Sequence, residues 1–177
     1  MDAGPTGLVA GTVIAVALAH TGRGPERPER EWFRRRLVAV EPSAAGSASA
    51  DVVSAIVDVF DIYFSGVNLG TPRSAYAAFS AHQQAKNPYV GWAENVADSR
   101  NENVTILGLG DSVDDVGTGP VTAQVSFRSH QPGDKGVKQG ETCTDWSLTY
   151  TLIPDAGGTG YLIDRAKPTS GGGHSTC

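Results

Sequence analysis

The sequence predicts an α+β domain in which two to three N-terminal helices pack on a curved, mainly antiparallel sheet of about four strands. Apolar residues recur at helical spacing from Val52 to Tyr63. Farther along the chain, apolar and polar residues alternate from Val121 to Arg128 and again from Asp145 to Leu152, as they do in strands with one buried face. Because the helical pattern comes first and the strands follow together, we expect the helices to cover one face of the sheet.

Size and charge limit the classes of function. The chain has 177 residues, of which 40% are hydrophobic, and this is enough for one ordinary core. The net charge is -5, but residues 1–36 carry six arginines against four acidic residues, so the remainder is more acidic than the total suggests. Such a body repels phosphates and lacks a basic cluster with interleaved aromatic residues. We therefore expect no nucleic-acid partner.

The first residues carry conflicting signals about a membrane. Residues 3–21 are uncharged and form a marginal membrane anchor, although their apolar part, residues 7–19, is shorter than the roughly 20 residues that span a bilayer. A secretory signal peptide has a basic residue before its apolar run, and here the arginines follow it instead. By the positive-inside rule, that order would hold the following chain in the cytoplasm.

Three explanations of this leader stay open. In the first, the apolar run is the end of a longer membrane region and Met1 is not the natural start. In the second, Arg34–Arg36 begin a second, weak export signal that ends at Ala48–Ala50. In the third, the leader is disordered. Residues 42–50, PSAAGSASA, have the composition of a flexible linker. We therefore expect a leader over residues 1–50, a folded domain over 51–168 and a flexible tail over 169–177.

Helix signals follow one another after residue 50. Asp51 precedes the apolar stripe and favours a helix N-terminus there. Thr71 and Pro72 supply an N-cap and a first helical residue for a second, shorter helix. The Asn87–Pro88 pair interrupts the chain, and the aromatic residues of 89–92 predict a third short helix or an ordered loop.

Four strands are expected in the second half, over residues 104–109, 121–128, 142–153 and 160–166. In the third of these, alternation places Trp146, Leu148 and Tyr150 on one face. We expect that face to meet the helices and to pack on Phe60, Tyr63 and Phe79. Asp145 in this strand and Asp164 in the last strand alternate with apolar residues. Both carboxylates should therefore face solvent.

The chain has two cysteines, Cys143 at the start of a predicted strand and Cys177 at the end of a Gly/Ser-rich tail. A lone cysteine in such a tail has nothing to pack against, so we expect the two to form a disulfide. A disulfide implies an oxidising compartment, and hence an extracytoplasmic protein that is membrane-anchored or secreted. The alternative is two unrelated thiols.

The order of elements, read with particular residues, resembles the nuclear transport factor 2-like superfamily, the cone-shaped α+β fold shared with ketosteroid isomerases and polyketide cyclases. More narrowly, it resembles the extracytoplasmic domains of actinobacterial membrane proteins, some of which stand at the outer end of a sensor or kinase. The residues that carry the likeness are Phe60–Asn68, Ala75, Tyr76, Phe79, Tyr89–Trp92, Cys143–Tyr150 and Tyr161–Asp164. The missing conventional N-terminal signal departs from that pattern.

The resemblance implies a cone-shaped interior that accepts a ligand. Its candidate lining residues are aromatic: Phe60, Tyr63, Tyr76, Phe79, Trp92, Phe127, Trp146 and Tyr150. An isomerase of this fold needs a carboxylate base and a hydrogen-bond donor in the cone, and Tyr63 is the only candidate donor that we identify. The four histidines have no spacing typical of a metal site, so we expect neither a metal nor a cofactor.

We therefore expect a non-catalytic extracytoplasmic binding or scaffolding domain for a small apolar ligand or a protein partner. Two alternatives remain at this stage. One is a small isomerase or cyclase with Tyr63 as donor, and the other is a structural domain that forms a homodimer through its sheet face. A superfamily that contains both enzymes and binding modules does not decide between them.

Overall fold

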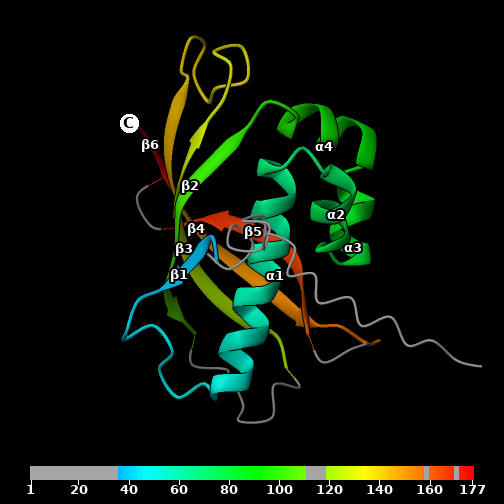
Figure 1. The fold of residues 1–177 in the computed structure, drawn as a ribbon, viewed down its shortest axis with the longest axis vertical. Coiled ribbons are helices and arrows are strands. Elements are labelled where there is room, and N and C mark those ends of the chain that lie inside the picture. The colour runs from blue at the N-terminus through cyan, green and yellow to red at the C-terminus, as the bar shows by residue number, and fades with distance from the viewer. Residues whose placement is uncertain (1–35, 111–118, 158–159, 170–171) are drawn as a thin grey trace, which may run out of the picture. The chain divides into compact units, whose positions relative to one another are not determined.

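The computed structural model describes residues 36–110, 119–157, 160–169 and 172–177, and residues 35–177 form one compact unit. The described residues form four helices and six strands, so the α+β class is confirmed with more elements than predicted (Figure 1). The helices are α1 (Ala50–Asn68), α2 (Pro72–Ala77), α3 (Ala81–Lys86) and α4 (Tyr89–Val96). The strands are β1 (Val38–Val40), β2 (Arg100–Leu109), β3 (Val121–His130), β4 (Cys143–Pro154), β5 (Tyr161–Pro168) and β6 (His174–Thr176).

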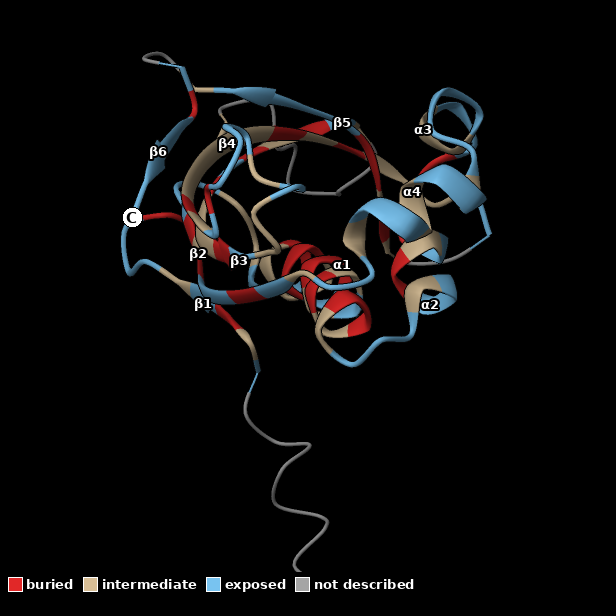
Figure 2. Cartoon of the chain, turned by 90° about the horizontal axis from the view of Figure 1, so that it is seen from above, coloured by how far each residue is buried: buried red, intermediate tan, exposed pale blue. Residues whose placement is uncertain are grey.

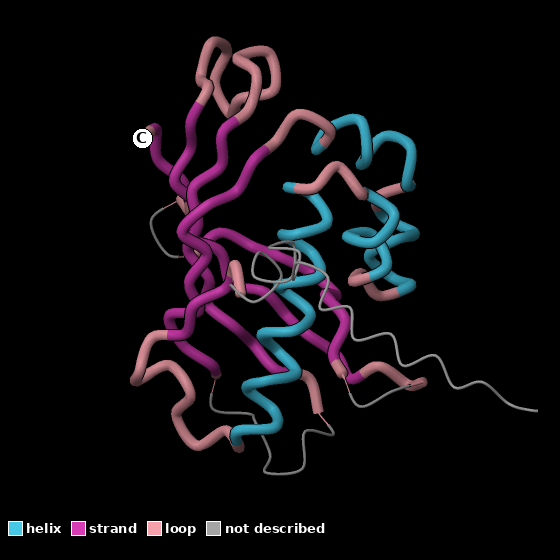
Figure 3. Tube along the Cα trace, in the orientation of Figure 1, coloured by secondary structure: helices cyan, strands magenta, loops and turns pink. Residues whose placement is uncertain are grey.

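The strands form one sheet in the order β1-β2-β3-β4-β5, with β6 paired to β4. Only the β1–β2 pair is parallel among these described strands, and the long strands β2 to β5 form an antiparallel meander. In Figure 3 the helices gather on one side of this sheet. The predicted arrangement of helices on one sheet face is therefore observed.

Helix α1 provides the central apolar stripe. Its N-cap is Ser49, whose hydroxyl accepts a hydrogen bond from the Val52 N–H, while Asp51 lies in the first turn and favours the positive end of the helix dipole. Ile56 and Phe60 are fully buried, and the Phe60 ring meets Tyr150 of β4 edge-on at 5.0 Å between centroids. Figure 2 shows the buried residues gathered on α1 and on the strand faces around it. Burying one such aromatic side chain contributes about 1.5 to 3 kcal/mol.

Close contact between α1 and α2 requires a glycine. A Cβ at Gly66 would lie 2.7 Å from the backbone nitrogen of Ala75, so only a residue without a side chain allows this approach. The chain turns between the two helices at Gly70, whose φ of +65° suits glycine. Pro72 then begins α2, as the sequence predicts, although the Thr71 hydroxyl donates to the Gly66 carbonyl and does not cap α2.

The sheet begins before the predicted boundary at Asp51. Strand β1 pairs with β2, the Val38 side chain is buried, and Ala44 in the expected linker is also buried. The Ala44 carbonyl accepts a hydrogen bond from the Leu109 N–H at the end of β2. Residues 37–49 are therefore part of the folded unit, because small apolar residues can fill a narrow site beside the sheet even where the composition resembles a linker.

The far end of the chain is also ordered where it is described. Residues His174–Thr176 form β6 along the first residues of β4, and the Cys177 N–H donates to the Cys143 carbonyl. The predicted disulfide joins these same two cysteines, whose Cα atoms are 5.6 Å apart. The tail expected to be flexible thus ends as a strand, because pairing with β4 satisfies its backbone groups.

Register shifts interrupt the strand alternation at three places in the described sheet, two along β2 and one between β4 and β5. In β2, residues 103 and 104 stand opposite one residue of β3, and Asn103 has a φ of 55°. In β5, Ile163 pairs with Leu152 and Arg165 pairs with Thr151, so Asp164 is the extra residue. The expectation that Asp164 faces solvent is wrong, because the bulge turns its side chain into the protein and only 6% of the residue is exposed. Asp145 does lie at the surface, in an ion pair with Arg128.

No helix in the described ranges is long and apolar enough to cross a bilayer. The predicted anchor at residues 3–21 and the arginines up to Arg35 lie outside the described residues. They stay predictions of the sequence.

Candidate functional site

An aromatic cavity of about 300 Å³ lies between α1, the short helices and the inner face of the sheet. Its lining residues are Tyr63, Phe64, Val67, Phe79, Gln83, Asn87, Trp92, Val96, Ser99, Asn101, Phe127, Ser129, Trp146, Leu148, Tyr150, Ile163 and Ala166. None of these residues carries a charge. The cavity therefore suits an apolar occupant with a small number of hydrogen-bonding groups.

The cavity walls are rings in mutual contact. Phe64 of α1 packs on Phe127 of β3 with 4.9 Å between centroids, and Phe127 stacks on Trp146 of β4 at 6.2 Å. On the helical side, Phe79 lies 5.4 Å from both Tyr63 and Trp92. Aromatic pairs at these separations hold one another in place, so the cavity has firm walls.

Six of the eight predicted pocket residues line the cavity, and two do not. Phe60 is one turn away on α1 and is fully buried against Tyr150. The Tyr76 ring packs against Trp92, and its hydroxyl lies within hydrogen-bond distance of the carbonyls of Gln84 and Asn87 near the C-terminal end of α3. These two residues support the cavity wall from behind. Binding by the other six stays a prediction.

Two tyrosines line the cavity from opposite layers, Tyr63 from α1 and Tyr150 from β4. Burial raises the pKa of Tyr63 to about 12. Burial also raises the pKa of Tyr150 well above its ordinary value, and the nearby Tyr63 raises it further. Both side chains therefore stay protonated at neutral pH and act as hydrogen-bond donors.

At another part of the cavity, the structure places two polar residues that the sequence analysis missed, Asn101 and Ser129. They are direct partners across β2 and β3. The Asn101 backbone exchanges two hydrogen bonds of 2.7 Å with the Asn68 side chain, which links β2 to the end of α1. Asn101 itself is only 8% exposed, and its side-chain amide makes no hydrogen bond to another described residue.

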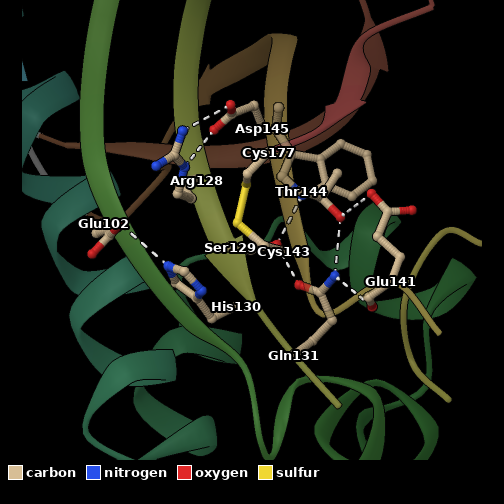
Figure 4. Close-up of polar contacts among 11 residues, drawn as sticks. Glu102, Arg128, Ser129, His130, Gln131, Glu141, Cys143, Thr144, Asp145 and Cys177 are labelled. Atoms are coloured by element: carbon tan, nitrogen blue, oxygen red, sulfur yellow. Dashed lines mark hydrogen bonds and ion pairs between the residues drawn. A yellow bond between two sulfur atoms is a disulfide. The ribbon is translucent and has the colours of Figure 1, made fainter. Parts of the chain in front are cut away.

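A chain of hydrogen bonds fixes Ser129 from behind (Figure 4). The Trp146 indole N–H donates to Ser129, and the Ser129 hydroxyl donates to the Gln131 amide oxygen. The Gln131 amide nitrogen donates to Thr144, whose hydroxyl donates to the Glu141 carboxylate. All four bonds run toward the carboxylate, so each one polarises the next. Ser129 therefore has its proton engaged and can offer only an oxygen lone pair to the cavity.

Glu141 ends this chain as a partnered carboxylate beside the disulfide. Burial raises the pKa of Glu141, but hydrogen bonds from Thr144, the Lys138 backbone and Thr176 outweigh that effect and lower it. Thr176 belongs to β6, which the Cys143–Cys177 disulfide holds against β4 (Figure 4). The disulfide thus supports the strand from which Trp146 lines the cavity.

Helix α3 borders the cavity through Gln83, and a buried carboxylate holds its start. Asp164 accepts hydrogen bonds from the Ser80 hydroxyl at 2.8 Å and from His82 Nδ1 at 3.0 Å, and the Arg165 guanidinium donates to its other oxygen. Burial raises the pKa of Asp164, but these three donors outweigh it and lower it. His82 thus pairs with this carboxylate, although about half of its side chain is exposed.

A second hollow of about 650 Å³ lies outside this cavity, against α1 and the start of β5. Asp51 and Asp58 are exposed along its wall, so it is an acidic surface and not an enclosed site. Within the described residues, no cluster of three or more histidine, cysteine, aspartate or glutamate side chains could hold a metal ion.

The chain was compared with protein families, curated proteins and solved structures, and no match was found. The resemblance to the cone-shaped superfamily therefore stays a prediction. Function has to be argued from the cavity, since a fold alone does not determine it.

Proposed function

We propose that this chain is a non-catalytic, extracytoplasmic binding domain that accepts a small apolar ligand in the aromatic cavity. The observation that carries the proposal is a cavity walled by seven aromatic side chains from both layers of the fold and lined, in the described residues, by no charged group. Such a combination of apolar walls and a few polar groups is typical of ligand sites.

The volume of the cavity limits the ligand. At about 300 Å³, it lies at the lower end of the range for small-molecule sites, roughly 300 to 1,000 Å³. The same volume of liquid water would hold about ten molecules. The ligand is therefore the size of one or two fused rings and much smaller than a lipid with two chains.

The positions of the carboxylates support binding over acid–base catalysis. An isomerase or cyclase needs a carboxylate that reaches the bound substrate. The buried Asp164 instead accepts hydrogen bonds from Ser80, His82 and Arg165, and it is not among the residues that line the cavity. Tyr63 has the position expected of a donor, but it has no partner base among the described lining residues.

The disulfide supports the proposed location. Cys143 and Cys177 are bonded, and protein disulfides persist in oxidising compartments. A binding domain of this kind would meet its ligand outside the cytoplasm, and the resemblance to extracytoplasmic domains agrees with that location.

The experiment is a titration of the full chain with N-phenylnaphthylamine, a neutral dye that fluoresces strongly in apolar sites. Ala166 is an exposed residue of β5 at the border of the cavity, so Ala166→Trp should block the entrance without disturbing the core. Lys167 is its exposed neighbour and does not line the cavity, so Lys167→Trp is the matched control. We expect saturable binding by the wild type and by Lys167→Trp, and a loss of at least about tenfold in affinity for Ala166→Trp.

Two outcomes would overturn the proposal. One is no saturable dye binding by the folded wild type. The other is binding that both tryptophan variants weaken equally, since that would place the dye outside the cavity.

A further inference from the structure

We propose that the cavity selects a neutral ring compound with a cis-amide edge, such as a lactam, and that the side-chain amide of Asn101 pairs with this edge through two hydrogen bonds. The inference rests on the proposed binding function and names the chemical class of its ligand. Three observations support it: a buried amide without a partner, a fixed backbone behind that amide, and a neighbouring hydroxyl that can only accept a hydrogen bond.

The first observation is that the Asn101 amide is buried without a partner. Asn101 is only 8% exposed, and its side-chain amide makes no hydrogen bond to another described residue. In the described part of the chain, no fully buried side-chain nitrogen or oxygen lacks a hydrogen bond, so the amide atoms of Asn101 must reach open space. The cavity is the open space that this residue lines. Because an unpaired buried amide costs free energy, an occupant that bonds to it is favoured over one that does not.

The strand register directs the Asn101 side chain to the cavity. Asn101 and Ser129 are direct partners across the antiparallel β2–β3 pair, so their side chains lie on the same face of the sheet. Side chains alternate along a strand, so Phe127 shares that face with Ser129. All three residues line the cavity. Asn101 and Ser129 therefore form a polar corner beside an aromatic wall.

The second observation is that the backbone of Asn101 is fixed. The Asn68 side chain, at the end of α1, donates to the Asn101 carbonyl and accepts from the Asn101 N–H, both at 2.7 Å. These two bonds use the backbone groups of Asn101 and leave its side-chain amide free. Helix α1 thus holds the amide in position before a ligand arrives, which reduces the entropy lost on binding.

The third observation concerns the hydrogen-bonding character of the polar corner. Ser129 accepts from the Trp146 indole N–H and donates its own proton to Gln131, so it has only an oxygen lone pair left. The Asn101 amide offers N–H donors and a carbonyl oxygen side by side. The corner therefore presents two oxygen acceptors together with its N–H donors, and its ligand needs a donor as well as an acceptor.

A cis-amide edge meets this requirement without any charge. Its N–H donates to the Asn101 side-chain oxygen while its C=O accepts from the Asn101 side-chain nitrogen. A lone carbonyl would satisfy the nitrogen and leave the oxygen without a donor, and a site that bonds to a ligand N–H rejects analogues that lack it. A charged ligand would find no side chain of opposite charge among the described lining residues, and burying an unpaired charge is far more costly than burying a neutral amide.

The experiment compares two benzo-fused rings of the same shape, carbostyril and coumarin. Carbostyril is a lactam, and coumarin is the matching lactone, in which an ring oxygen replaces the N–H. Isothermal titration calorimetry on the full chain measures the dissociation constant of each compound. For the wild type, we expect carbostyril to bind about tenfold more tightly than coumarin, because only the lactam supplies a donor to the Asn101 oxygen.

The variant Asn101→Leu removes the amide, keeps the approximate size of the side chain and leaves the backbone bonds to Asn68 in place. It should weaken carbostyril binding about tenfold and leave coumarin binding within about threefold, so that the preference for the lactam disappears. Asn95→Leu is the matched control, since Asn95 is an exposed residue of α4 that does not line the cavity. It should keep the wild-type preference.

The outcomes separate this inference from the proposed function. Equal affinity of the wild type for the two compounds, or no carbostyril binding by a wild type that binds N-phenylnaphthylamine, would overturn the inference while the binding function stands. A lactam preference that persists in Asn101→Leu would overturn it as well. The wild-type comparison needs no variant, so a poorly folded Asn101→Leu does not decide the result. If neither compound binds and N-phenylnaphthylamine does not bind either, the binding function itself fails.

Discussion

The Ser80 hydroxyl donates a 2.8 Å hydrogen bond to Asp164 Oδ1, and it thereby joins two residues that are 84 positions apart in the chain. Ser80 is also the N-cap of α3, because its oxygen accepts from the Gln83 N–H. No residue of α3 is buried. The attachment of this helix to β5 therefore depends on polar contacts. Asp164 is their common acceptor, because it binds both Ser80 and His82.

We expect Asp164→Ala to lower the free energy of unfolding by about 2 to 4 kcal/mol, because it leaves Ser80 and His82 without their shared acceptor. Urea unfolding followed by circular dichroism measures this change. Asp58→Ala is the control, since Asp58 forms an exposed ion pair with Arg36 and should cost no more than about 1 kcal/mol. Equal costs for the two variants would show that the Asp164 contacts do not stabilise the fold.

The stabilisation by Asp164 should depend on pH. Burial raises the pKa of its carboxyl group, but donors from Ser80, Arg165 and His82 lower it below the unfolded value of about 3.9. The carboxylate therefore stabilises the fold above about pH 4, and this contribution is lost as the pH falls through the folded pKa. We expect the difference in unfolding free energy between the wild type and Asp164→Asn to shrink from about pH 6 to pH 3. A difference that grows over this range would contradict the assignment.

Two glycine substitutions should have opposite effects. Gly66→Ala places a Cβ 2.7 Å from the Ala75 nitrogen and 2.8 Å from its Cβ, so it should destabilise the protein by about 1 to 3 kcal/mol. Gly91→Ala is the matched control within α4, where a Cβ meets nothing within 4 Å. It should stabilise the protein by about 0.5 to 1 kcal/mol through helix propensity. Thermal unfolding of both variants tests whether α2 packs closely on α1 at Gly66. If both variants raise the unfolding midpoint, that close contact is absent.

Removal of the disulfide should be costly. Cys143 and Cys177 are separated by 34 positions, and the chain-entropy model gives about 3 to 4 kcal/mol for closing such a loop. We expect the double variant Cys143→Ser/Cys177→Ser to lose about this much stability in urea unfolding. The reduced wild type is the control and should match it. Mass analysis of the oxidised wild type should find no free thiol, and two free thiols there would refute the pairing.

Two truncations should distinguish the leader from the fold. A chain that lacks residues 1–34 keeps β1 and should unfold cooperatively near the wild-type midpoint. A chain that lacks residues 1–48 loses the β1–β2 pairing, the buried Val38 and Ala44, and the hydrogen bond from the Val38 N–H to Asp61. We expect its unfolding midpoint to fall sharply. Equal unfolding midpoints for the two truncated chains would show that the folded domain begins at Asp51, as composition alone suggests.

Part of the candidate site could be predicted from the sequence. Helical spacing placed Tyr63 on the inner stripe of α1, and alternation placed Phe127, Trp146 and Tyr150 on the inner face of the sheet. The same reasoning also predicted Phe60 as a pocket residue, although it does not line the cavity. The apolar stripe of α1 contains residues that pack on the sheet as well as residues that face the cavity, and spacing alone does not separate them. The sequence did not predict that Asn101 lines the cavity. The bulge at Asn103 interrupts the alternation of β2, so the alternation does not show which face of the sheet Asn101 lies on.

By itself, the sequence determined the α+β class, the apolar stripe of α1 and the strands β3 to β5, and it favoured a disulfide between the two cysteines. These features depend on residue periods or on residue chemistry, which are local properties. Only the tertiary structure decided that β1 and β6 join the sheet, that a bulge buries Asp164, and that Tyr63 and Tyr150 line the same cavity. Strand pairing and bulges depend on residues far apart in the chain, so the pattern of one segment does not contain them.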